Sequence, residues 1–264
     1  MALASALVVS GQFRRVEPPQ REPVASPASK PQPRRFVGEH PITILSGLLS
    51  SSPERRKQAL QQLGVASADA TESIQASIRA VNLDSDPELE YVLILVPTFP
   101  PASTAYVFDK DERGWWIVGE FSYGWHWDAN EAERFLELRE IVRRGRKDIL
   151  VRDMEGGTGL QETDLSIYRI ANGALYRIFE TVEEREGWVV GTSATEYEHR
   201  MIDFPDPDED GKVFLVSHYE KNTVFSNHER PDRRSTSCAA YRWDAESFVF
   251  VVDSTAAKTK CGAR

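Results

Sequence analysis

From residue 74 onward, apolar and polar positions follow the pattern of β-structure. Residues 74–81 alternate between apolar and polar side chains, a period of two that is typical of a half-buried strand. Tyr91–Val96 is a continuous apolar run, and similar short runs follow it, separated by turn residues. Long stretches with the 3.6-residue period of a helix are missing here. The pattern predicts a mainly β, antiparallel domain over residues 74–253.

The predicted strands repeat in three similar units. Each unit has a strand with tyrosine at its third position, followed by a turn and another apolar strand: Thr104–Asp109, Ser166–Ala171 and Ala239–Asp244. The tyrosines are Tyr106, Tyr168 and Tyr241, which are 62 and 73 residues apart. Four strands per unit and a period of this size predict a propeller-like array of about three four-stranded units. A generic run of hairpins, in which tyrosine is common, is the alternative to true repetition.

Three units leave the closure of the array open, because closed propellers usually have four blades or more. Either the helical region that precedes the strands closes the ring, or the units form an open stack or a two-sheet β-sandwich. The sequence does not choose between these arrangements.

The segment from residue 42 to residue 73 carries helix signals. A Ser-Ser-Pro-Glu run at 51–54 places hydroxyl groups, a proline and an acidic residue where a helix N-terminus favours them. Gly64 is a natural helix terminator, and residues 42–49 form a second short helix in this prediction. We expect residues 42–73 to pack as a helical cap on the β domain.

The N-terminus has two features of an exported protein. Residues 2–10 form a short apolar run with a small-residue ending, similar to a secretory signal peptide, although the first positive charge, Arg14, follows rather than precedes it. We therefore predict a signal-peptide remnant at 1–12 and a secreted or periplasmic protein, with a cytoplasmic protein as the alternative. Seven of the 15 prolines lie in residues 17–41, so 13–41 is predicted as an extended linker.

Cysteine use is sparse. The chain has two cysteines, Cys238 and Cys261, which in an exported protein are compatible with one disulfide that pins the C-terminal tail, residues 254–264, to the last strands. Their spacing does not match the Cys-x-x-Cys pairs of zinc knuckles or thiol redox motifs.

Charge narrows the class of partner. The chain has 32 Lys+Arg against 41 Asp+Glu, a net charge of −9, which argues against nucleic-acid binding. Residues 1–41 carry six basic and three acidic side chains (+3), so the remainder carries −9 − 3 = −12. A domain this acidic attracts cations, Ca²⁺ among them. The apolar runs are too short for a transmembrane helix.

One loop places oxygen-bearing side chains at alternate positions. They are Asn82, Asp84, Asp86 and Glu90. Ca²⁺ takes about six to eight oxygen ligands, and alternate residues of a tight loop can converge on one point to supply them. These four residues are therefore candidate metal ligands, with Ca²⁺ as the candidate cofactor.

This loop resembles the calcium-binding hairpin of FG-GAP/VCBS repeats, which occur in integrin α-like propellers and in secreted bacterial proteins. The resemblance implies that Asn82, Asp84, Asp86 and Glu90 bind Ca²⁺ and that Tyr91–Val96 is the strand that follows. The sequence departs from the family at Pro87, where the family has a glycine with positive φ, a conformation that proline cannot adopt.

The corresponding loops of the other two units keep less of the pattern. The second unit retains Gly145 and Asp148 but has Val142 and Arg144 at ligand positions, and Arg144 there would replace the ion's charge by pairing with Asp148. In the third unit Phe214 stands where the closing acid belongs, so solvated turn acids are the alternative to a site. Its weaker candidate ligands are Asp203, Asp206, Asp208 and Asp210.

An aromatic cluster is the remaining candidate site. Its residues are Tyr123, Trp125, His126, Trp127 and Asp128. Exposed Trp and Tyr faces are typical of sugar or peptide grooves, and a histidine beside an aspartate can titrate near neutrality. The alternative is a loop whose tryptophans fill the core while Asp128 caps a short helix.

Sequence motifs of catalysis are missing: the chain has no Gly-x-Ser-x-Gly elbow and no P-loop, and its histidines are scattered. The predicted function is a non-enzymatic, exported β-repeat binding or scaffolding module, stabilised by Ca²⁺, whose protein or glycan ligand is unknown. The alternative is a carbohydrate-active enzyme or lectin that uses Trp125–Asp128.

Overall fold

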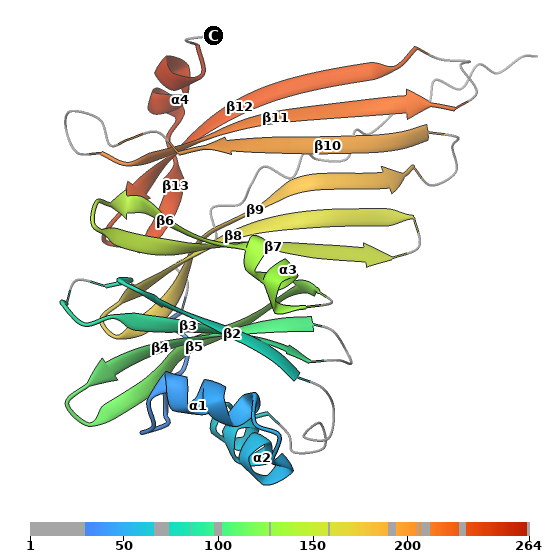
Figure 1. The fold of residues 1–264 in the computed structure, drawn as a ribbon. Helices are drawn as coiled ribbons and strands as arrows, with labels where there is room; N and C mark the ends of the chain where they lie inside the picture. Colours follow the sequence, from blue (N-terminus) through green and yellow to red (C-terminus); the bar gives the residue numbers. More distant parts are fainter. Residues whose placement is uncertain are drawn as a thin grey trace, which may run out of the picture.

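The computed structural model describes residues 30–65, 74–84, 86–97, 102–126, 128–157, 159–189, 194–204, 206, 212–226 and 231–262 (Figure 1). The predicted signal-peptide remnant at 1–12 and residues 13–29 of the predicted linker lie outside these ranges. None of the described helices is long and apolar enough to span a membrane.

Across these residues the strands form two antiparallel sheets, neither of which closes on itself. The first has the order β1-β5-β4-β3-β2 and contains β1 (Arg35–Phe36), β2 (Ile74–Val81), β3 (Glu90–Pro97), β4 (Ala102–Asp111) and β5 (Gly114–Trp125). The second runs in sequence order and contains β6 (Leu136–Arg143), β7 (Arg146–Gly157), β8 (Leu160–Ala171), β9 (Ala174–Trp188), β10 (Ala194–Asp203), β11 (Phe214–Phe225), β12 (Arg233–Asp244) and β13 (Val249–Val252). The prediction of a mainly β, antiparallel domain is confirmed.

The main strands group into three consecutive four-stranded meanders, β2–β5, β6–β9 and β10–β13. In each meander the repeated tyrosine lies on the third strand, opposite an apolar residue of the second strand. The pairs are Tyr106 with Leu93, Tyr168 with Ile149, and Tyr241 with Leu215. The second and third meanders share one sheet because the last residues of β9 pair with the first residues of β10. The paired residues run from Thr195 opposite Trp188 to His199 opposite Glu184.

The meanders are stacked in chain order (Figure 1). Between the first and second units, Val92 and Ile94 of β3 share a core with Ile149 of β7, and the rings of Phe121 and Tyr168 stack at 4.4 Å. Another core, between the second and third units, includes Ile167, Leu215 and Phe250 among its residues. Strands buried on both faces read as continuous apolar runs, which explains Tyr91–Val96.

Helices lie at both ends of the stack (Figure 1). Helices α1 (Pro41–Leu48) and α2 (Pro53–Gln62) pack Ile44 and Leu60 against Leu93 and Phe108 on the outer face of the first unit. At the other end, α4 (Ser254–Lys260) contacts β12, although none of the residues of this helix is buried.

The residues that predicted the start and end of the second helix have these roles in the structure. The Oγ of Ser52 accepts the Arg55 N–H at the start of α2, Pro53 is the first helical residue, and Gly64 has a φ of +74° just after the end. The disulfide with which the two cysteines are compatible is present: it joins Cys238 of β12 to Cys261 at the end of α4 and ties this helix to the sheet.

Part of the predicted linker packs along the first two units. The N–H of Gln32 donates to the Leu175 carbonyl at 3.1 Å, and its side-chain oxygen accepts the Glu120 N–H at 2.6 Å. A few residues later β1 pairs with β5, and the guanidinium of Arg34 lies 4.8 Å from the ring centre of Trp116. Residues 32–36 therefore bridge β5 and the start of β9.

Candidate metal centre

The loop between β2 and β3 is built from short side-chain to backbone hydrogen bonds. Asp84 Oδ1 accepts the Asp86 N–H at 2.8 Å, and Asp86 Oδ1 accepts the Glu88 N–H at 2.8 Å. The side-chain amide of Asn82 donates to the Asp86 carbonyl at 3.2 Å. These turns close the loop around Pro87 without the glycine that the FG-GAP pattern has there.

Glu90 closes the loop at the start of β3. Its side chain is almost fully buried, at 1% exposure, and its Oε2 accepts the backbone N–H groups of Leu83 and Asp84. The other oxygen, Oε1, is buried and has no hydrogen-bond partner among the described residues, and the same is true of Asn82 Oδ1. Burial, reinforced by the nearby carboxylates of Asp84 and Asp109, raises the pKa of Glu90 to about 7.

A third carboxylate comes from the neighbouring strand. The carboxylate of Asp109 of β4 meets those of Asp84 and Glu90, and one oxygen from each lies within 4.8 Å of the other two. Asp109 is itself buried, and burial raises its pKa to about 6. Asp109 is not among the ligands predicted from the sequence, although the antiparallel pairing of Tyr91 with Phe108 places it directly opposite Glu90.

The donor set suits a hard divalent cation. Two oxygens on opposite sides of Ca²⁺ are about 4.6–5.2 Å apart, so oxygens within 4.8 Å of one another can share one ion. Asn82 Oδ1 and Glu90 Oε1 are buried acceptors that an ion would satisfy. Of the predicted ligands, Asp84 and Glu90 belong to this group of three carboxylates, and Asn82 adds its unpartnered Oδ1. Asp86 lies outside the group and stabilises the turn instead.

The second unit fills the corresponding position with a guanidinium. Asp148 at the start of β7 is fully buried and accepts the Val142 N–H across its hairpin at 3.1 Å, as Glu90 does in the first unit. Its partner is Arg169 of β8, at 2.6 Å, and not Arg144 as predicted from the sequence. Arg144 sits at the hairpin turn, whereas Arg169 follows Tyr168 on the strand that pairs with β7.

The first loop is also attached to the second unit. Arg146 Nε donates to the Leu83 carbonyl at 2.8 Å, and the Lys147 N–H donates to the Asn82 carbonyl at 3.0 Å. Arg146 also donates to the Ile170 carbonyl of β8. The candidate metal loop and the β6–β7 hairpin therefore hold each other in place.

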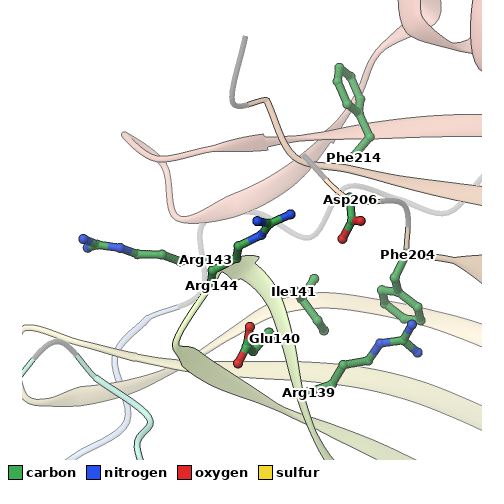
Figure 2. A pocket seen from close by; sticks show the side chains of 8 residues that line it. All are labelled: Arg139, Glu140, Ile141, Arg143, Arg144, Phe204, Asp206 and Phe214. Carbon is green, nitrogen blue, oxygen red and sulfur yellow. The ribbon is translucent and has the colours of Figure 1, made fainter. Parts of the chain in front are cut away.

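The third loop does not gather its predicted ligands in the part that is described. Asp203 lies 3.3 Å from Nε2 of His218, and Asp208 and Asp210 are outside the described residues. Asp206 lines a hollow of about 130 Å³ between the β6–β7 hairpin and the end of β10. Figure 2 shows this hollow; its other lining side chains include Arg139, Arg143, Arg144, Glu140 and Phe204, and Arg139 lies against the Phe204 ring.

The aromatic cluster does not form an open groove from its described members. Tyr123 and His126 are each 1% exposed; the Tyr123 hydroxyl donates to the Ala132 carbonyl at 3.2 Å, and His126 Nδ1 lies 2.9 Å from the Ser103 hydroxyl. Burial lowers the pKa of His126. Asp128 caps α3 (Ala129–Arg134), as the alternative interpretation expected. The side chains of Trp125 and Trp127 lie outside the description.

A hollow of about 660 Å³ opens beside this cluster, between the end of β5 and the β7–β8 hairpin. Asp153, which accepts the Gly124 N–H, and Glu155 line it. Directly across the ladder, Asp164 pairs with Asp153, so acidic side chains share one face. Burial and the surrounding carboxylates, Glu162 first, raise the pKa of Asp164 to about 6.

Asp164→Asn should stabilise the protein at neutral pH. A pKa raised above the value of about 3.9 in the unfolded chain means that the wild type loses stability as the pH rises from about 4 through 6. The variant should lack this loss and be more stable by about 1 kcal/mol at pH 7, a figure kept small because the side chain is partly exposed and screened by solvent. Urea unfolding at pH 4 and pH 7 measures it. If the stability of the two proteins depended equally on pH, the raised pKa of Asp164 would be contradicted.

No known family model, curated protein or solved structure matches this chain. The resemblance to FG-GAP/VCBS repeats therefore stands on the first loop and on the strand pattern.

Proposed function

We propose that the chain is a non-enzymatic, exported β-repeat module for binding or scaffolding, stabilised by Ca²⁺ at the loop between β2 and β3. The observation that best supports a bound cation is the buried, unpartnered Oε1 of Glu90 beside the carboxylates of Asp84 and Asp109. Leaving such an oxygen without a partner costs free energy, and a divalent cation would satisfy it and balance the neighbouring charges.

The stacking supports a propeller-like repeat array that is open. Three meanders with tyrosines at equivalent positions are what a member of the FG-GAP/VCBS group would have, with Ca²⁺ in the first unit and the Asp148–Arg169 pair in the second. Helices at both ends favour an open stack over a closed ring or a two-sheet β-sandwich.

Export is supported by the disulfide, since such bonds persist in oxidising compartments. A carbohydrate-active enzyme or lectin that works through Tyr123–Asp128 has less support, because Tyr123 and His126 are buried and Asp128 is engaged as a helix cap.

Melting curves in Ca²⁺ and in EDTA test the cation. At a hundredfold excess over its Kd, Ca²⁺ should stabilise the wild type by about 2.7 kcal/mol. Asp109→Asn should lose most of this gain, because it removes one of the three converging carboxylates. Asp86→Asn, a change in the same loop outside that group, should keep it. An unchanged melting temperature in the wild type, or the same gain in Asp109→Asn, would overturn the proposal.

A further inference from the structure

Strands of the eight-stranded sheet, β10, β11 and β12 among them, project at one end beyond the rest of the molecule (Figure 1). Exposed aromatic residues lie on β9 and β10 of this sheet. Trp188 at the end of β9 is 75% exposed, and Tyr197 on β10 is 41% exposed. Large aromatic side chains are usually buried, so an indole this open on a β-strand calls for a ligand or a partner.

The two rings lie on the same face of the sheet. Trp188 is opposite Thr195 and Glu186 is opposite Tyr197 in the antiparallel ladder. Because opposite residues share a face and residues two apart in a strand do so too, Trp188 and Tyr197 are diagonal neighbours. Gln161, opposite Glu186 on β8, adds its amide to the same face.

The indole of Trp188 rests on the β7–β8 turn. The backbone N–H of Trp188 donates to the Gly159 carbonyl at 3.1 Å, and a Cβ on Gly159, which has a φ of +86°, would be 3.7 Å from the indole ring. The ring therefore lies on the side of Gly159 where another residue would carry its side chain. With 75% of the residue exposed, the remaining indole surface is open to a ligand.

Beside the rings is a hollow of about 260 Å³ lined mainly by hydrogen-bonding groups: Gln161, Thr163, Glu184, Glu186, Tyr197 and His199 are among its residues. Glu184 lies 3.3 Å from His199, a pair whose charges match only when the histidine is protonated. Arg185, which also lines the hollow, is paired with Glu162 of β8. The carboxylates of Glu184 and Glu186 therefore make this face acidic, which disfavours an anionic ligand.

We propose that this face binds a neutral glycan chain. The C–H groups of a sugar ring stack on the open faces of Trp188 and Tyr197, while Gln161, Thr163 and Glu186 bind its hydroxyl groups. The acidic lining repels an acidic polysaccharide, and separate rings among polar groups differ from the apolar centre of a protein interface. The inference rests on the proposed binding module and supplies its ligand class.

Affinity electrophoresis of the full chain in gels that contain soluble neutral polysaccharides tests it; the panel is hydroxyethylcellulose, xyloglucan, galactomannan and dextran. At least one should retard the wild type. Trp188→Ala should weaken that binding about tenfold or more, Trp188→Phe should keep part of it, and Leu49→Ala, an exposed apolar residue on the helical cap, should leave it unchanged.

Three results would overturn the inference: no retardation by any of the four polysaccharides, equal retardation of Trp188→Ala, or a dimer in size-exclusion chromatography that Trp188→Ala dissociates, which would assign the face to a second copy of the chain. Melting in Ca²⁺ separates this inference from the proposed function. A Ca²⁺ shift without glycan binding removes only the ligand class, whereas glycan binding without a Ca²⁺ shift removes only the cation.

Discussion

Arg169→Met should destabilise the protein by about 3–5 kcal/mol, because it leaves the carboxylate of Asp148 buried without its counter-charge. Asp148 is fully buried and the Arg169 side chain is 5% exposed, with 2.6 Å between them. Burial raises the pKa of Asp148 and the guanidinium of Arg169 opposes that rise. Urea unfolding followed by tryptophan fluorescence at pH 7 measures the loss.

Two further variants separate the ion pair from general damage to β8. The double variant Asp148→Asn, Arg169→Met should recover much of the stability, since an asparagine can still accept the Val142 N–H without carrying a charge. Arg177→Met on β9 breaks the exposed pair with Glu180 and should cost less than about 1 kcal/mol. A loss in Arg169→Met no greater than in Arg177→Met would contradict the interpretation.

Removal of the disulfide should lower the free energy of unfolding by about 3 kcal/mol. The bond joins residues 23 apart, and opening a loop of this size releases chain entropy in the unfolded state by about that amount. In the folded state it holds the end of α4 near β12, where Lys260 lies over the ring of Phe214 at 4.3 Å.

Urea midpoints with and without dithiothreitol measure this effect. The double variant Cys238→Ser, Cys261→Ser should match the reduced wild type and should not respond to the reductant. Equal stability of the oxidised and the reduced wild type would contradict the prediction, because the bond would then contribute nothing to the free energy of unfolding.

Features set by local periodicity and local chemistry were predictable from the sequence. The period of two placed the β domain, and the recurring tyrosines of the third strands marked the three meanders because their register is the same in each. Capping by Ser52 and Asp128 depends on side chains that bind backbone N–H groups two or three residues away, so it too is visible in the chain.

Contacts between strands were harder to predict. Asp109 joins Asp84 and Glu90 through the pairing of β3 with β4, and predicting it requires the register of these two strands. For the same reason the predicted partner of Asp148 was wrong: Arg144 is near it in sequence, but Arg169 is its neighbour on the adjacent strand. The second and third units share a sheet because β9 pairs with β10, and no local sequence pattern predicts this pairing.

Calorimetric titration with Ca²⁺ at pH 8 shows whether one unit of the three binds a cation. At this pH both Glu90 and Asp109 are ionised, since their pKa values are about 7 and 6. We expect one Ca²⁺ per chain, lost in Asp109→Asn and retained in Asp86→Asn. Binding of three ions per chain, or of none, would contradict it.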